Sequence, residues 1–101
     1  MIHVIADIRT APGARPRVLQ ALAAITPLVR AEAGCLGYTA TLDADTDLLR
    51  QTRDDTSILM VERWESLEHL KAHLEAPHML AYRKQVTADV VDVSLRVLTE
   101  A

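Results

Sequence analysis

Apolar and polar residues alternate in four stretches of the chain, residues 1–9, 35–42, 57–65 and 89–99. A repeat of two places successive side chains on opposite faces of an extended backbone, so the pattern predicts four strands. One face of the first strand carries Ile2, Val4, Ala6 and Ile8. In the second strand we expect one face to carry Leu36, Tyr38, Ala40 and Leu42. The fourth strand repeats the pattern with Val91, Val93, Leu95 and Val97.

Between the first two strands, apolar residues recur with helical spacing. They are Val18, Leu22, Ile25 and Val29. Pro16 suits the first turn of this helix, where its missing N–H costs nothing. Gly34 is expected to end the helix. Pro27 lies inside the repeat and predicts a kink or a loosened last turn.

A second helical stretch follows the third strand. Ser66 is a good N-cap for it, because a serine side chain accepts a hydrogen bond from the first helical turn. The expected buried stripe consists of Leu67, Leu70 and Leu74. Pro77 then restarts the helix, and its stripe continues through Met79, Tyr82 and Val86.

Residues 43–56 follow neither repeat. The segment holds five aspartates against Arg50 and Arg53, and Leu48 and Leu49 form its only apolar pair. Such a polar segment between two strands predicts a long loop or the tip of a hairpin.

The predicted order is β-α-β-β-α-β, which is typical of an α+β, ferredoxin-like fold with a four-stranded antiparallel sheet and two helices on one face. The other face would be apolar, with Ile5, Leu59, Val61 and Leu98. A soluble chain rarely leaves such a face open to water. We therefore expect a homodimer through the open face of the sheet.

Composition narrows the possible partners. The chain has 101 residues, enough for one domain over residues 1–101, and half of them are apolar. Its net charge is −3. Nucleic acids and anionic membranes are bound by basic surfaces, so neither is an expected partner.

Two further features concern the cellular compartment. Cys35 is the only cysteine, so no disulfide within the chain can form, which fits the reducing cytoplasm. No apolar run approaches the roughly 20 residues of a membrane span. The first residues lack the basic start of a secretory signal, so we expect a cytoplasmic protein.

Large rings are rare in this chain, which has one tryptophan, two tyrosines and no phenylalanine. Trp64 stands where the third strand meets the second helix, upstream of His73, His78 and Tyr82. Trp64 could be ordinary core, or it could line a pocket and stack on a planar aromatic ligand. A histidine beside such a pocket can act as a general base near neutral pH. Tyr82 and Tyr38 could equally be core residues or pocket residues.

Glu65, His69 and His73 follow one another at intervals of four, a spacing that can bind a metal. With the leucine stripe facing the core, however, His69 would point to solvent and His73 would lie at the flank of the stripe. We therefore expect no metal site here. Cys35 has no pairing histidine or cysteine nearby and is expected to be a small buried residue.

Two sequence blocks resemble the antibiotic biosynthesis monooxygenase family, which includes quinol monooxygenases. The first block is Gly34-Cys35-Leu36-Gly37-Tyr38. The second runs from Glu62-Arg63-Trp64-Glu65-Ser66 through Ala72-His73 to Pro77-His78. The resemblance covers nearly the whole chain and implies the dimeric α+β barrel of that family.

The resemblance also implies a site. It predicts a small pocket in each subunit, with His73 and His78 as catalytic candidates and a small aromatic ligand. The candidate substrate-binding residues are Trp64, Tyr82, Tyr38, Met60 and Leu70. The best-understood members oxidise phenols or quinols to quinones with O₂ and no cofactor. A phenolate is electron-rich enough to reduce O₂, so the protein need only bind and deprotonate it.

Departures from the family leave alternatives open. Polyketide-oxidising members carry an asparagine and a tyrosine where this chain has Met60 and Leu70. Proton transfer would then fall to a histidine, or the protein would be a non-catalytic binding module. Haem-degrading relatives need an asparagine and a histidine where this chain offers Ile8 and Arg83, which argues against haem. A branch that isomerises phosphorylated sugars shares the His73 and Pro77-His78 pattern and is a further alternative.

Overall fold

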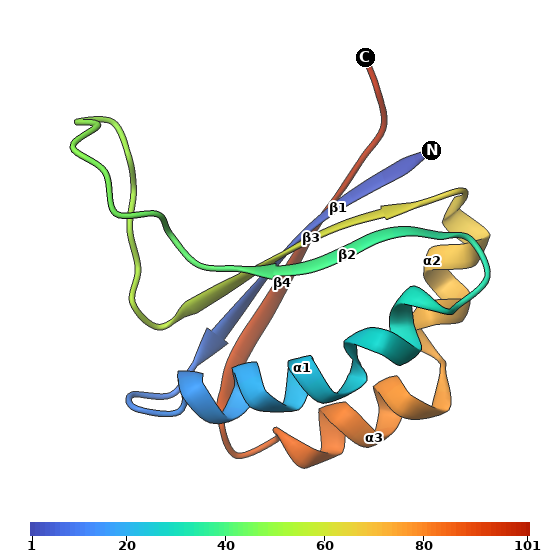
Figure 1. Cartoon of the computed structure of the whole chain (residues 1–101), viewed down its shortest axis with the longest axis horizontal. Coiled ribbons are helices and arrows are strands. Elements are labelled where there is room, and N and C mark those ends of the chain that lie inside the picture. The colour runs from blue at the N-terminus through green and yellow to red at the C-terminus, as the bar shows by residue number, and fades with distance from the viewer.

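The computed structural model describes residues 1–101 and contains four strands and three helices (Figure 1). In chain order these elements are β1 (Ile2–Thr10), α1 (Arg15–Arg30), β2 (Cys35–Thr41), β3 (Ser57–Trp64), α2 (Leu67–Leu74), α3 (Pro77–Gln85) and β4 (Val90–Leu98). The strands pair antiparallel in the order β2-β3-β1-β4. The predicted ferredoxin-like α+β fold is confirmed, with the second helical stretch divided into α2 and α3 at Pro77.

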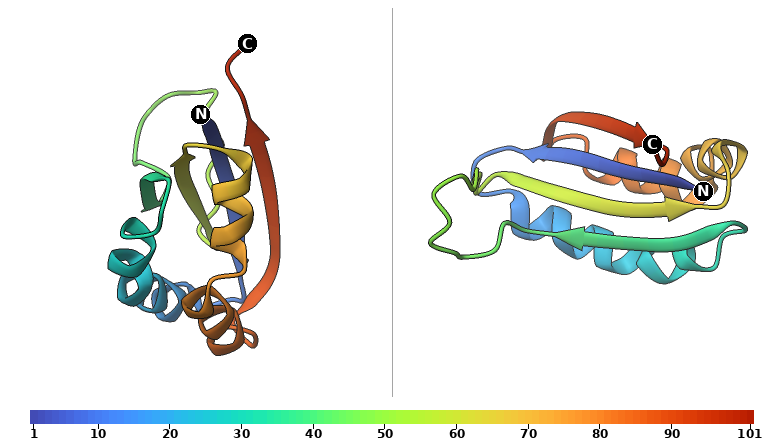
Figure 2. Two further views of the ribbon diagram at one scale, coloured as in Figure 1. Left: turned by 90° about the vertical axis from the view of Figure 1, so that its right-hand side faces the viewer. Right: turned by 90° about the horizontal axis from the view of Figure 1, so that it is seen from above.

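Strand alternation builds the core as the sequence predicted. Val4 and Ile8 of β1 and Ile58 and Met60 of β3 are buried on one face of the sheet. The stripe of α1 packs against that face, and Val18 and Val29 are fully buried. Figure 2 shows the helices gathered on this side of the sheet. In β1, β3 and α1 the apolar repeat thus marks the face that lies between the two layers.

No helix packs over the core-facing side of β4. Val93, Leu95 and Val97 pair with Ile8, Ala6 and Val4, so they lie on the same face as the core. All three are nevertheless about half exposed. They stay exposed because the helices pack mainly over β2, β3 and one another. The uncovered side of β4 borders the cavity described below.

The predicted alternation of β2 is wrong at Leu36. The pairing of β2 with β3 shifts between Cys35 and Gly37, where a bulge inserts one extra residue. Cys35 therefore lies opposite Trp64 while Tyr38 lies opposite Glu62, and both point to the core face. Leu36 is turned outward and is 43% exposed. A bulge depends on pairing with another strand, so alternation within one strand does not reveal it.

The first helix ends earlier than Gly34. It continues through Pro27 and stops at Arg30, where the Ala31 N–H donates to the Pro27 carbonyl. A turn then leads into β2, and Gly34 within it adopts a positive φ of 78°. A Cβ at Gly34 would stand 2.3 Å from the ring of His69. Gly34 is required both by the left-handed backbone and by the close approach of α2.

The Ser66 prediction is confirmed, because its side chain accepts a hydrogen bond from the His69 N–H at 3.2 Å. The acidic segment 43–56 is the connection between β2 and β3 and projects beyond the end of the sheet (Figure 1). It carries its own hydrogen bonds, such as Gln51 Nε2 to the Ala44 carbonyl at 2.7 Å. Leu49 at its tip is fully exposed. None of the helices is long and apolar enough to cross a membrane.

The face of the sheet away from the helices carries the predicted apolar residues, interspersed with charged ones such as Arg63 and Arg96. Ile5 lies opposite Val61, Leu59 lies opposite Asp7, and Leu98 lies opposite His3. Val61 is 43% exposed. The Oδ1 atom of Asp7 is buried on this face and has no hydrogen-bond partner. We call the apolar part of this surface, made of Ile5, Leu59, Val61 and Leu98, the open face.

The two glycines with positive φ allow a matched test. Gly13 has the same φ of 78° as Gly34, but nothing lies within 4 Å of its added Cβ. Gly13→Ala should cost about 1 kcal/mol of unfolding free energy, from the backbone alone. Gly34→Ala should cost at least about 1 kcal/mol more, because the His69 ring must also move. Urea unfolding of both variants measures the difference, and equal losses would contradict the role given to His69.

Candidate active site

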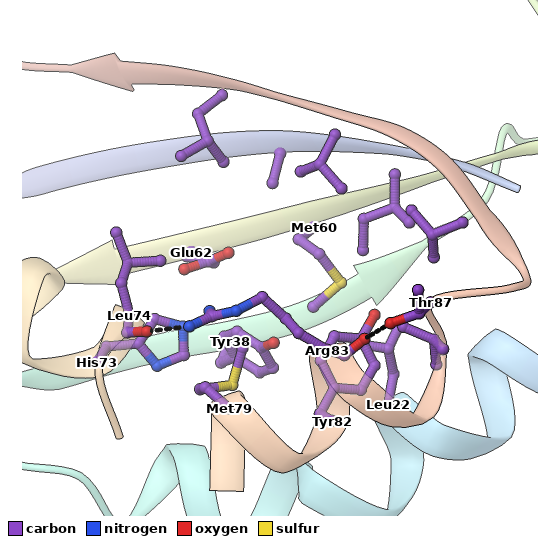
Figure 3. A pocket seen from close by; sticks show the side chains of 16 residues that line it. Leu22, Tyr38, Met60, Glu62, His73, Leu74, Met79, Tyr82, Arg83 and Thr87 are labelled. Atoms are coloured by element: carbon purple, nitrogen blue, oxygen red, sulfur yellow. Dashed lines mark hydrogen bonds between the residues drawn. The ribbon is translucent and has the colours of Figure 1, made fainter. Parts of the chain in front are cut away.

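A cavity of about 410 Å³ lies between the helix-covered face of the sheet and helices α2 and α3. Twelve of its sixteen lining residues are hydrophobic. Among its polar members are Glu62 on β3, His73 on α2 and Arg83 on α3 (Figure 3). An apolar cavity with a few convergent polar groups is typical of a small-molecule site.

Four of the seven predicted site residues line this cavity: Tyr38, Met60, His73 and Tyr82. The alternation of β3 brings Met60 to the wall, and the stripe of α3 brings Tyr82. The other three, Trp64, Leu70 and His78, are not part of the wall. Trp64 is fully buried and Leu70 is 3% exposed, so in this conformation both pack inside the protein.

His73 is more deeply buried than the sequence predicted, at 2% exposure. The expected stripe of α2 was centred too far toward Leu67, which is 41% exposed. The helix instead buries Leu70 and His73. The His73 ring lies 4.6 Å from that of Trp64 and 5.5 Å from that of Tyr38, measured between ring centroids. Two aromatic neighbours thus hold the imidazole in place.

The carboxylate of Glu32 joins the two histidines. Its Oε2 atom lies 3.0 Å from His73 Nδ1 and 2.7 Å from His78 Nε2. A carboxylate only accepts hydrogen bonds, so Nδ1 of His73 carries a proton. In the neutral imidazole the other nitrogen, Nε2, then has a free lone pair, and no protein group bonds to it. Glu32 therefore prepares His73 to accept a proton.

A second carboxylate, Glu62, lies on the sheet wall of the cavity. It is 6% exposed, and its Oε1 accepts a hydrogen bond from Trp64 Nε1 at 3.0 Å. Burial raises the pKa of Glu62, while the Trp64 hydrogen bond and the nearby His73 oppose this shift. Trp64 therefore contacts both groups, with its ring beside His73 and its N–H on Glu62.

The two tyrosines of the cavity remain neutral near pH 7. Burial raises the pKa of Tyr82 to about 12. Burial also raises the pKa of Tyr38 well above its ordinary value, with help from the nearby Glu62. Neither hydroxyl can act as a base, but each can hydrogen-bond an oxygen of a ligand.

Two residues of the site were not among those predicted from the sequence: Glu62, which lines the cavity, and Glu32, which bonds to His73. Arg83, a candidate from the sequence for binding a phosphate group, also lines the cavity. Glu62 could have been found, because strand alternation places it on the same face as Ile58 and Met60. Glu32 gave no such signal, since it stands in a turn 41 residues from His73. Only the packing of α2 against that turn brings the two together.

The two histidines of α2, His69 and His73, have different hydrogen-bond partners. His69 Nδ1 lies 2.7 Å from the Ser66 hydroxyl, whereas His73 Nδ1 faces Glu32. No group of three or more histidine, cysteine, aspartate or glutamate side chains is arranged to hold a metal ion. Cys35 is partly buried against the core, and burial raises the pKa of its thiol.

Known proteins share this architecture. The family model described as antibiotic biosynthesis monooxygenase matches residues 1–85. The chain belongs to the antibiotic biosynthesis monooxygenase family. It is 45% identical over 100 residues to the probable quinol monooxygenase YgiN of Escherichia coli K12. This match covers 97% of this chain and 96% of the relative. A protein of the same name from Shigella flexneri matches equally.

Solved structures agree with the family assignment. Rv0793 from Mycobacterium tuberculosis is 31% identical and superposes with a TM-score of 0.81, covering 99% of this chain and 94% of that one. PA3566 from Pseudomonas aeruginosa is 28% identical with a TM-score of 0.83, covering 99% and 93% of the two chains. A structure from Nitrosomonas europaea, at 17% identity and a TM-score of 0.84 over 99% of this chain and 98% of that one, shows the fold alone.

The raised pKa of Glu62 predicts how stability depends on pH. The folded protein holds the Glu62 proton more tightly than the unfolded chain does. Protonated Glu62 therefore stabilises the folded protein fully at pH values below 4.5, the ordinary pKa of a glutamate. This stabilisation is lost as the pH rises through the raised pKa of Glu62 in the folded protein. Glutamine stays uncharged, so Glu62→Gln should stabilise the protein at about pH 7 and lose that advantage near pH 4.

Thermal unfolding of the parent and the Glu62→Gln variant at both pH values checks this expectation. Glu65→Gln is the matched control, because Glu65 is exposed on the same segment and should show no such pH-dependent difference. A constant difference between Glu62→Gln and the parent across this range would contradict the burial effect.

Proposed function

We propose that this protein is a cofactor-independent monooxygenase that oxidises a small aromatic phenol or quinol with O₂. The observation that carries the proposal is His73, a buried imidazole on the wall of an apolar cavity, with Nδ1 held by Glu32. The 45% identity to a probable quinol monooxygenase supports the substrate class.

The chemistry follows from the site. The free Nε2 of His73 takes the hydroxyl proton of the ligand, which leaves an electron-rich phenolate. The phenolate gives electrons to O₂, so that a naphthol and O₂ yield a naphthoquinone and water. Tyr82, a neutral phenol, orients an oxygen of the ligand. No metal or cofactor takes part in this proposal.

Trp64 acts indirectly in this scheme. Its ring packs on His73 and its N–H holds Glu62, so it positions two groups of the cavity wall. His78 likewise acts through Glu32 and does not line the cavity itself. Both are therefore positioning residues in the proposal, and His73 is the proposed base.

One observation favours the isomerase alternative. A phosphorylated ligand needs a cation, and Arg83 lines the cavity, where its Nη2 also donates to the Leu74 carbonyl. Arg9 instead pairs with Asp54 at 3.1 Å, and Arg63 donates to the Leu36 carbonyl. An isomerase would act without O₂. Met60, an apolar side chain on the cavity wall, equally suits a binding module that performs no chemistry.

We also propose that two copies associate through the open face. The helices leave this apolar surface uncovered, and the buried Oδ1 of Asp7 lacks a partner there. A second sheet would bury the apolar residues of both copies at once. The cytoplasmic location stays a prediction from the single cysteine.

The proposed base can be tested with the pure, metal-free protein. O₂ consumption is measured against a panel of hydroquinones and naphthols, above the rate of spontaneous oxidation. His73→Gln should lower turnover by about 100-fold or more, because a general base typically contributes that much. His78→Gln should have a smaller effect. His69→Gln is the control, because His69 does not line the cavity and should keep parental turnover.

The other outcomes separate the alternatives. A parent protein that consumes no O₂ with any compound, while ligands still quench Trp64 fluorescence, would refute the oxygenase and support a binding module. Turnover of a sugar phosphate without O₂, lost in Arg83→Gln, would support the isomerase.

The proposed dimer has its own test. Light scattering after gel filtration should give twice the 11.2 kDa mass of the chain. Val61→Asp should shift this mass to the monomer, because it places a charge on the open face. Leu80→Asp is the control, since Leu80 is similarly exposed but lies on α3. A parent monomer, or a Val61→Asp dimer, would refute this interface.

A further inference from the structure

Glu62 is a carboxylate that the proposed proton transfer to His73 does not use. It belongs to β3 and lines a cavity that is otherwise mostly apolar (Figure 3). Trp64 occupies its Oε1 atom, and no protein group bonds to Oε2. Placing a carboxyl group among apolar side chains is costly. A free oxygen at such a place is available to a ligand.

The oxidation of a phenol needs a second proton transfer. After His73 has taken the hydroxyl proton and O₂ has added to the ring, the peroxide anion takes that proton back from His73. The attacked carbon then carries both a hydrogen and a hydroperoxide. The quinone forms only when that hydrogen is removed as a proton. Its electron pair then forms the new C=O bond, the O–O bond breaks, and hydroxide leaves.

This second base has to meet a different part of the ring from the first. The attacked carbon lies across the ring from the hydroxyl group, and its hydrogen projects from the ring face once the carbon is tetrahedral. His73 comes from α2 and Glu62 from β3, so the two groups stand on different walls of the cavity (Figure 3). A ligand in the cavity therefore borders both groups.

We infer that Glu62 is the base that removes the ring C–H proton from the hydroperoxide and returns it to the departing hydroxide as water. The carboxylate is regenerated, so each phenol and O₂ give one quinone and one water. This inference rests on the proposed oxygenase function and adds a second catalytic residue to it.

The surroundings of Glu62 suit this role. His73 faces it from α2, with Glu32 behind that ring, Tyr38 lies opposite on β2, and Arg83 borders the cavity from α3. Burial raises the pKa of Glu62, which makes the carboxylate a stronger base than an exposed one. The Trp64 hydrogen bond keeps the side chain in one orientation.

Two substrate types separate the second base from the first. A naphthol loses a ring hydrogen on its way to the quinone, whereas a hydroquinone and O₂ give quinone and hydrogen peroxide without breaking a C–H bond. Glu62→Gln keeps the acceptor for Trp64, and its rate of hydroquinone oxidation should fall far less than its rate of naphthol oxidation. Its rate of quinone formation from 1-naphthol should fall about 100-fold, the usual contribution of a general base.

Three readouts accompany the rate in the Glu62→Gln variant. A peroxide assay should detect accumulated hydroperoxide, and quinone formed per O₂ consumed should fall below one. Deuterium at the carbon para to the hydroxyl should slow quinone formation, since the C–H step now limits it. Glu62→Asp should restore part of the rate, and Glu65→Gln should match the parent.

The failures are distinguishable. Parental quinone yield from naphthol in Glu62→Gln would overturn the role of Glu62 and leave the oxygenase intact. A parent that oxidises hydroquinones but no naphthol would overturn it too, because no C–H step would exist. A parent that consumes no O₂ with either substrate type would refute the oxygenase proposal itself.

Discussion

The hydrogen bond between Glu32 and His73 is the interaction on which the site depends. It links the turn after α1 to the buried face of α2, and the same carboxylate oxygen reaches His78 at the start of α3. A carboxylate with low exposure is stable here because both histidines donate to it. The bond also sets which nitrogen of His73 carries the proton. Local packing and candidate chemistry are thus coupled through a single side chain.

Incomplete cover of the sheet creates the space for a ligand. The helices pack over β2 and β3 and leave the apolar side of β4 without a helix. A chain of this size has too little apolar mass to fill every layer, and the gap remains as the cavity. The open face on the other side reflects the same limit, because all helices lie on one side of the sheet. One architecture therefore produces both the proposed ligand site and the proposed dimer surface.

The fold persists across wide sequence divergence, since a structure only 17% identical superposes with a TM-score of 0.84. Within that fold this chain has Met60 and Leu70 where the resemblance to polyketide-oxidising members leads one to expect an amide and a phenol. The structure instead places Glu62 and His73 on the cavity wall, with Glu32 bonded to His73. In the proposed reaction His73 and Glu62 carry the protons, and Trp64 holds both in position.

The sequence by itself determined the element order, the core faces of β1 and β3, the Ser66 cap and the family. These features depend on residues close together in the chain, whose spacing follows the period of a helix or a strand. Tertiary structure alone decided the outward turn of Leu36, the burial of His73 and the contact with Glu32. Each of these depends on how separate elements pair or pack, and neither a strand register shift nor a contact across 41 residues leaves a periodic signal.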